Sequence, residues 1–280
     1  MRRVLLAALA AWSFGSVACG GEALNVLSFN LRYNNAKDGA NAWPNRKEMA
    51  AEVFKDNAVD LAGLQEALIG QIQDLKKALP EYEWVGVGRD DGDKAGEFAP
   101  IFYRRDRLEL IRSGHFWLSE TPDSPGMGWD AACPRIATWA VFKDRETGRS
   151  FFFLNTHLDH IGNVARREGV RLILAKLAEL GTDLPVMVTG DFNSTPDSPV
   201  VQAMTSDATI PLKSAATLTD RGERGDATFN GFRDNGPSNV IDYIFVNPDV
   251  TVDSCSYLVV KRGDVFVSDH WPVLARVSLR

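Results

Sequence analysis

The fold is indicated most clearly by one stretch, Val186-Met187-Val188-Thr189-Gly190-Asp191-Phe192-Asn193. The apolar run 184–188 ends at Gly190, which is typical of a buried strand that reaches an open edge of a sheet. On a strand, Asp191 and Asn193 would point to the same face and could hold a water or a metal ion against a phosphate. A strand that ends in an ordinary Asx turn would carry the same residues. The residues at the other strand ends must therefore distinguish a functional site from a simple turn.

The composition is that of a globular protein. The chain has 280 residues, 45% of them hydrophobic, which suffices for one large or two ordinary domains. Without a Pro/Gly/Ser-rich linker or a repeat, we expect a single domain over residues 24–280, and a monomer. The formal net charge of −6 provides no general basic surface for nucleic acid. It does not exclude a nuclease, because a metal ion and a few arginines can neutralise a phosphate.

Residues 1–23 are expected to be a secretory signal peptide. Arg2-Arg3 precede the apolar run 4–12, and small residues follow it, which is the usual order of such signals. The apolar run is too short to span a bilayer as a stable helix. Cleavage is expected after Ala18 or after Ala23, and the mature protein is then periplasmic or extracellular.

The three cysteines leave two questions open. Cys19 would allow a lipoprotein anchor, although Ser16 stands where such signals usually carry Leu. In an exported protein, Cys133 and Cys255 could form a disulfide. The sequence does not show whether they meet, and two isolated buried thiols are the default expectation.

Strands outnumber helices along the chain, and the two are interleaved. Periodicity predicts helices at 46–56, 69–79, 165–180 and 199–204. It predicts strands at 24–33, 59–66, 82–87, 100–105, 108–114, 136–142, 150–157, 184–193, 228–232, 241–246, 258–261 and 273–279. Residues 119–134 form a long loop of the kind that carries function. Two mixed sheets packed face to face with helices outside, an α+β four-layer α/β/β/α sandwich, would bury these elements around one core.

Polar side chains recur where the expected strands end, at Asn30, Glu66, His157, Asp191 with Asn193, Asp242, and Asp269 with His270. Most of them have ordinary explanations as caps or turn residues. Asp242 is the exception, because it lies in an apolar run and a buried carboxylate is costly without a partner. His270 is a suitable partner, since the carboxylate would fix the imidazole tautomer and favour its charged form.

The order of these motifs resembles the endonuclease/exonuclease/phosphatase superfamily over residues 24–280. The matching segments are Asn30, Gln65-Glu66, Asn155-Thr156-His157, Gly190-Asp191-Phe192-Asn193, Ile241-Asp242-Tyr243 and Ser268-Asp269-His270. Members include secreted deoxyribonucleases, abasic-site endonucleases, sphingomyelinases, inositol-polyphosphate 5-phosphatases and deadenylases. The resemblance implies a four-layer fold with the active site at one end of the sandwich.

The resemblance also implies a divalent metal ion. Glu66 would be its main ligand with Asn30 beside it, and Asp269 would be a second or a water-mediated ligand. Oxygen ligands favour a hard cation, Mg²⁺ first and Mn²⁺ second.

The resemblance further implies in-line attack of water on a phosphate ester. Asp191 would orient and deprotonate that water, and Asn193 would hold the water or the phosphate. His157 and His270 would donate hydrogen bonds to the phosphate oxygens, with Asp242 paired to His270.

Two arginine positions are suggested by the residues alone. Arg104 or Arg105, and Arg135 beside the long loop, flank strand ends and could supply fixed positive charge to a phosphate, although a surface arginine is the commoner case. Asp159 and His160 follow His157 closely, but the resemblance does not extend to them and no role is assigned.

The sequence therefore predicts a secreted, metal-dependent phosphodiesterase or phosphomonoesterase that acts on a small or flexible phosphate ester. An extracellular nuclease of the same superfamily is the alternative, although no run of Lys and Arg provides a DNA-binding loop. A binding module that kept the fold and lost catalysis is the alternative from another class, and the complete motif set argues against it.

Overall fold

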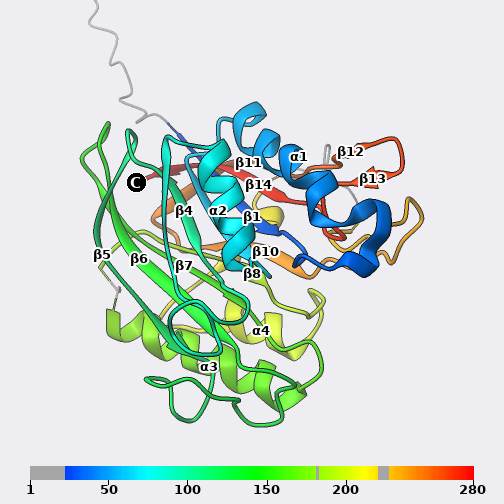
Figure 1. The fold of residues 1–280 in the computed structure, drawn as a ribbon. Helices are drawn as coiled ribbons and strands as arrows, with labels where there is room; N and C mark the ends of the chain where they lie inside the picture. Colours follow the sequence, from blue (N-terminus) through cyan, green and yellow to red (C-terminus); the bar gives the residue numbers. More distant parts are fainter. Residues whose placement is uncertain (1–22, 181–182, 220–226) are drawn as a thin grey trace, which may run out of the picture.

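The computed structural model describes residues 23–180, 183–219 and 227–280. Apart from Ala23, the predicted signal peptide with Cys19 lies outside these residues. Two six-stranded sheets make up the body of the molecule (Figure 1). In the described part of the chain, no helix has the length and apolar character of a membrane span.

The first sheet has the strand order β11-β14-β1-β2-β4-β3. Its strands are β1 (Leu24–Asn30), β2 (Leu61–Gln65), β3 (Tyr82–Val85), β4 (Ile101–Arg104), β11 (Val250–Tyr257) and β14 (Val273–Leu279). β1 and β2 are parallel, and β14 runs antiparallel to β1. The sheet is therefore mixed, as the sequence predicts.

The second sheet has the strand order β5-β6-β7-β8-β10-β9. Its strands are β5 (Leu108–Trp117), β6 (Ile136–Asp144), β7 (Ser150–His157), β8 (Val186–Asp191), β9 (Lys213–Ser214) and β10 (Asp242–Val246). β5, β6 and β7 form an antiparallel meander, whereas β7 and β8 are parallel. A separate hairpin pairs β12 (Lys261–Arg262) with β13 (Val265–Phe266).

Helices cover the outer face of each sheet (Figure 1). α1 (Trp43–Asp56) and α2 (Ile69–Ala78) pack on the first sheet, and α3 (Asn163–Leu180) and α4 (Pro199–Ser206) pack on the second. Short 3-10 helices lie at Ala36–Asn41 and Ala215–Thr217. A third apolar cluster, which includes Phe142, Phe153 and Ile244, fills the space between the sheets. This confirms the four-layer α/β/β/α sandwich.

A polar contact joins the two sheets near the functional end. A Cβ added at Gly63 would lie 2.0 Å from Thr189 Oγ1 and 2.5 Å from Asn155 Oδ1, so only glycine allows this approach. The Asn155 amide donates to Leu64 O at 2.7 Å and its oxygen accepts from Gln65 Nε2 at 2.7 Å. Because buried amides need such partners, Asn155 and Gln65 hold the adjacent strand ends in a fixed relation.

Three details differ from the sequence prediction. Residues 228–232 form no strand, and Phe229 makes only isolated bridges to Asn239 and His270. Residues 258–260 are also irregular, while the strand β11 just before them was missed; its exposed polar residues hide the alternation. α1 begins at Trp43, earlier than the predicted helix at 46–56, and includes Pro44, because the first helical turn tolerates proline.

Candidate active site

The strand pairing brings the polar strand ends to one edge of the sandwich. Asp191 is the last residue of β8 and lies opposite His157 of β7 and Asp242 of β10 in the sheet register. β1 and β2 end at the same side with Asn30 and Gln65 in register. Parallel neighbours end together, and antiparallel ones begin there, so chain topology alone gathers these residues.

Asp242 and His270 form a buried pair. His270 Nδ1 lies 2.8 Å from Asp242 Oδ2, and His270 Nε2 lies 3.8 Å from Asp191 Oδ2. Burial by itself would lower the pKa of the His270 imidazole, but the charge and hydrogen bond of Asp242, with Asp191 and Asp269 nearby, raise that pKa well above its usual value. His270 is therefore an imidazolium that directs Nε2–H toward Asp191.

Asp191 is held in an unusual protonation range. Burial and the nearby charge of Asp242 raise the pKa of its carboxyl to about 7, against the opposing effects of His270, the Asn193 N–H and Asn30. A carboxylate poised near neutral pH is suited to accept a proton from water. Asp191, Asp242 and His270 are also close enough to hold a metal ion, but the imidazolium already provides the positive charge between the two carboxylates.

Asn30 links two carboxylates. Its Nδ2 donates to Glu66 Oε1 at 3.1 Å and to Asp191 Oδ2 at 3.0 Å, while its Oδ1 accepts from the Arg32 N–H at 2.9 Å. Asn30 thus lies beside Glu66, and its amide nitrogen orients the Glu66 and Asp191 carboxylates.

Glu66 and Asp269 are two further carboxylates that line the same cavity as Asp191. Glu66 has a left-handed backbone with φ of +57°, a conformation that is rare for residues other than glycine. The Tyr33 N–H donates to its Oε2 at 3.1 Å. Burial raises the pKa of the Asp269 carboxyl, against the opposing charges of His270 and of Arg32, whose Nη1 lies 3.7 Å from Asp269. Glu66, Asp269 and Asp191 thus bring three carboxylates to one cavity.

Asn193 lies beyond the end of β8, with a φ of +47°. The expectation that it shares a strand face with Asp191 was therefore wrong, although both line the same cavity. The Asn193 amide nitrogen lies 3.0 Å from Leu158 O and 3.1 Å from His157 Nε2. Burial, with Arg135 and Arg89 nearby, lowers the pKa of His157 well below its usual value, so this imidazole is neutral.

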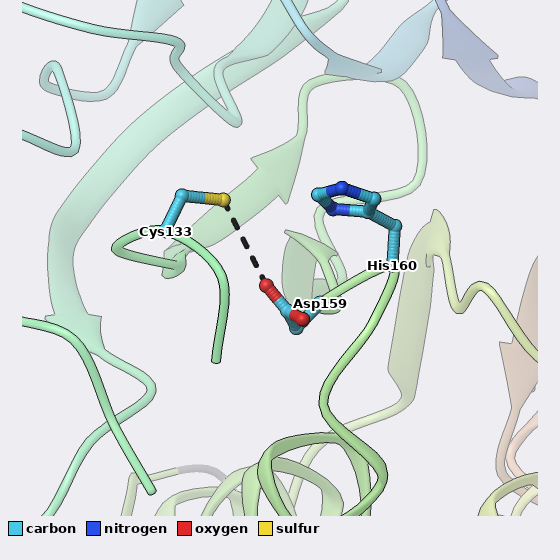
Figure 2. A group of neighbouring side chains, drawn as sticks. All are labelled: Cys133, Asp159 and His160. Atoms are coloured by element: carbon cyan, nitrogen blue, oxygen red, sulfur yellow. Dashed lines mark hydrogen bonds between the residues drawn. The ribbon is translucent and has the colours of Figure 1, made fainter. Parts of the chain in front are cut away.

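Arg135 and His160 line the same cavity, and Arg135 also contacts the buried Asp159. Arg135 Nε is 3.4 Å from Asp159 Oδ2, and Nη2 is 2.9 Å from His160 Nδ1. Figure 2 shows Cys133 directed toward the same Asp159, at 3.7 Å. Cys133, Asp159 and His160 are spaced closely enough to bind a metal ion. However, the Arg135 guanidinium already contacts Asp159 Oδ2 and His160 Nδ1, two of the atoms that would bind the ion. Asp159 also accepts from the Ala132 N–H, so it fixes the long loop.

Arg104 does not belong to this site. It forms ion pairs with Asp60 and Asp106, and it pairs with Tyr82 at the far end of the first sheet. The neighbouring Arg105 is mostly exposed and lies near Glu83. β4 runs antiparallel to β2, so the end of β4 is remote from the end of β2 that carries Glu66; this corrects the phosphate-binding expectation for Arg104 and Arg105.

The strand ends open into a cavity of about 720 Å³. Its lining includes Glu66, His157, Asp191, Asn193, Asp269, His270 and Arg135. Arg89 and Glu97 also line it and form a two-pronged ion pair, at 2.6 Å and 3.0 Å. No pattern in the sequence indicates that pair, because both residues lie in an irregular loop. Cys133 borders the cavity, whereas Cys255 lies in the core, so these two cysteines do not form a disulfide with each other.

Comparison with known proteins agrees with this geometry. Residues 24–270 match the Endonuclease/Exonuclease/phosphatase family. An endonuclease/exonuclease/phosphatase from Bacteroides vulgatus is 44% identical, with a TM-score of 0.88 over 92% of this chain and 99% of its own. A mannosyl-6-phosphatase from Bacteroides thetaiotaomicron is 39% identical, with a TM-score of 0.86 over 91% of this chain and 99% of its own.

The human Nocturnin catalytic domain, solved with a sulfate anion, is 20% identical and has a TM-score of 0.73 over 92% of this chain and 94% of its own. At that identity the likeness concerns the fold alone. The family match over nearly all described residues, and the two closely similar Bacteroides structures, are decisive. The chain belongs to the endonuclease/exonuclease/phosphatase family and is a phosphoester hydrolase.

Proposed function

We propose that this chain is an exported, divalent-metal-dependent phosphomonoesterase that acts on a sugar phosphate by in-line attack of water. The observation that carries the proposal is the contact of the buried His270 ring with Asp242 on one side and Asp191 on the other. It places an imidazolium donor beside a carboxylate of raised pKa at the mouth of one cavity. An acid and a base held side by side are what phosphoester hydrolysis requires.

The carboxylates that line the cavity suit a hard divalent cation. Glu66, Asp269 and Asp191 offer carboxylate oxygens that line one cavity, and burial raises the pKa of the two aspartates. Oxygen donors of this kind suit Mg²⁺ or Mn²⁺. When bound, the ion would act as a Lewis acid that neutralises charge on the phosphate.

The protein's own groups have separate tasks in this reaction. Asp191 accepts the proton of the attacking water, and Asn30 and the Asn193 N–H keep its carboxylate in place. His270 donates from Nε2 to a phosphate oxygen as negative charge develops there, while Asp242 keeps the ring charged. Arg135 contributes fixed positive charge from the cavity wall, since its guanidinium is buried and already bonded to Asp159 and His160.

The preference for a sugar monoester is supported by a relative and by the cavity. The Bacteroides thetaiotaomicron protein, 39% identical over 99% of its length, is a mannosyl-6-phosphatase. The cavity of about 720 Å³ lies in the range of small-molecule sites. The net charge of −6 disfavours a general nucleic-acid substrate.

A substrate panel tests this proposal. Purified residues 24–280 with Mg²⁺ or Mn²⁺ would be given mannose 6-phosphate, other sugar phosphates, inositol phosphates, bis(p-nitrophenyl) phosphate, sphingomyelin, RNA, and single-stranded and duplex DNA. Asp191→Asn serves as the blank. We expect the highest kcat/KM for a sugar monoester. Preferential cleavage of DNA or RNA would favour the nuclease over the sugar phosphatase. Turnover of diesters alone would contradict the proposed monoesterase activity.

Export is part of the proposal and rests on the first 23 residues. The charged, apolar and small segments in that order support it. Expression of the full chain in a bacterium, followed by fractionation and N-terminal sequencing, tests it. We expect a periplasmic or secreted product that begins after Ala18 or Ala23, or a lipid-linked product that begins at Cys19. A cytoplasmic product that retains residues 1–23 would contradict export.

A further inference from the structure

Two buried polar atoms behind the catalytic edge lack a hydrogen-bond partner among the described residues. They are Nδ1 of His157 and Nη1 of Arg135. Both residues line a small cavity of about 10 Å³, together with Glu97 and the apolar Phe98 and Ile136. That volume is close to the smallest that holds one water molecule. Since unpaired buried polar atoms are costly, the cavity calls for one small hydrogen-bonding partner.

The surroundings of Asn193 determine which nitrogen of His157 carries the proton. The Asn193 amide nitrogen is anchored 3.0 Å from the Leu158 carbonyl oxygen, which can only accept, so the amide is not reversed. The same nitrogen lies 3.1 Å from His157 Nε2, and it can only donate. Nε2 accepts from this closer partner, since the Asp191 Oδ2 atom is farther from it at 3.5 Å, and in a neutral imidazole the proton is then on Nδ1. His157, which lines the small cavity, thus has a buried N–H donor at Nδ1 that needs an acceptor.

We propose that one water molecule in this cavity accepts hydrogen bonds from His157 Nδ1 and Arg135 Nη1 and donates one to the Glu97 carboxylate. Two donors and one acceptor around a single site match the hydrogen-bonding capacity of water. A chloride ion would match the donors but not Glu97, whose negative charge lines the same cavity. The ion pair with Arg89 keeps Glu97 in position.

This water makes His157 a positioning residue, an inference that rests on the proposed function of the site. With one N–H of Asn193 directed to Leu158 O and the other to His157 Nε2, the remaining polar atom of that amide is its carbonyl oxygen. Asn193 lines the large cavity beside Asp191, so this oxygen can accept a hydrogen bond from the attacking water. His157 would then act through Asn193, which replaces the expectation that His157 donates to the phosphate.

Nitrogen-15 NMR of the histidine rings tests the tautomer without substrate or metal. The chain has only four histidines, and His157→Gln assigns the signal of interest. His160 is an internal reference of the opposite tautomer, because Arg135 Nη2, which can only donate, lies 2.9 Å from its Nδ1. We expect protonated Nδ1 on His157 and protonated Nε2 on His160. Protonated Nε2 on His157, or rapid exchange between tautomers, would overturn the proposal.

Glu97 variants test the water. Glu97→Leu removes the acceptor, so the His157 ring is expected to populate both tautomers and kcat to fall by about 10- to 100-fold, as for other outer-shell partners, with KM nearly constant. Glu97→Gln keeps an oxygen and should keep the Nδ1–H signal. Glu83→Leu, on the partly exposed β3, is the matched control with wild-type spectra and rates. An unchanged His157 signal in Glu97→Leu would refute the water, whereas inactivity of the wild-type chain on every ester would refute only the proposed function.

Discussion

Replacing Asp242 by Asn separates charge from geometry at the catalytic edge. The Asp242 carboxylate lies 2.8 Å from His270 Nδ1, and both residues are buried, with exposed fractions of 2% and 4%. An Asn oxygen can still accept the Nδ1–H hydrogen bond, so the ring should keep its orientation. What is lost is the negative charge that raises the pKa of His270.

The expected effect on catalysis is large. At neutral pH the variant ring should be largely neutral, so His270 no longer presents an imidazolium donor to the phosphate as charge develops. Loss of one such stabilising group typically lowers kcat by about 10²- to 10³-fold. KM should change much less, because the interaction strengthens mainly in the transition state. Stability should fall by about 1 kcal/mol at pH 6, the usual difference between a hydrogen bond to a charged group and one between neutral groups.

The pH dependence provides a second, independent readout. The folded-state pKa of His270 is raised, so the pair's stabilisation is fully present below the unfolded pKa of about 6.5 and is lost as pH rises through the folded value. Activity that needs the imidazolium follows the same direction. In Asp242→Asn, kcat should therefore begin to fall at a lower pH than in the wild type. The difference in unfolding free energy between the variant and the wild type should become smaller at high pH.

The assay combines kcat/KM profiles between pH 5 and 10 with NMR titration of the His270 ring. Asp253→Asn, on the exposed face of β11, is the matched control and should leave both unchanged. If Asp242→Asn keeps the wild-type kcat and the wild-type His270 titration, the carboxylate does not hold this imidazole in its charged form and the reasoning fails.

Three further predictions concern the residues around the site. Arg46→Met should lower the free energy of unfolding by about 2–4 kcal/mol, measured by urea denaturation, because the buried guanidinium donates to four carbonyl oxygens, of Asn41, Leu31, Val267 and Arg32; a change within error would contradict it. Asp130→Ala should lower the urea midpoint of unfolding, because Asp130 caps the α3 N-terminus from the long loop, whereas the control Asp123→Ala should leave that midpoint unchanged. Mg²⁺ should bind about tenfold more tightly at pH 8 than at pH 6 by calorimetry, since the Asp191 carboxyl with a pKa of about 7 must lose its proton; pH-independent affinity would argue against Asp191 at the metal site.

The architecture could be predicted because hydrophobic periodicity and strand-end residues are local signals. The apolar run before Asp191 is the buried strand β8, and the pairing of Asp242 with His270 followed from the cost of an isolated buried carboxylate. The gathering of these residues at one edge follows from parallel β1–β2 and β7–β8 pairs. These features follow from the pattern of residues and elementary electrostatics alone.

Other features depend on contacts that no local pattern encodes. Arg89 and Glu97 meet inside an irregular loop, and the direction of the Asn30 amide is set by the Arg32 N–H. Asn193 leaves the strand with a left-handed backbone, which an extended-strand argument cannot anticipate. Arg104 was misplaced because its distance from the site depends on the direction of β4 relative to β2.

The most direct measurement is phosphate release from mannose 6-phosphate by purified residues 24–280, with Mg²⁺ and with a chelator. It would be made on the wild-type chain, Asp191→Asn and His270→Ala, with folding of each checked by circular dichroism. We predict turnover by the wild-type chain with Mg²⁺ only, and a loss of at least about 10²-fold in each variant. Wild-type rates in either folded variant, or in the chelator, would contradict the assignment of metal-dependent hydrolysis to these residues.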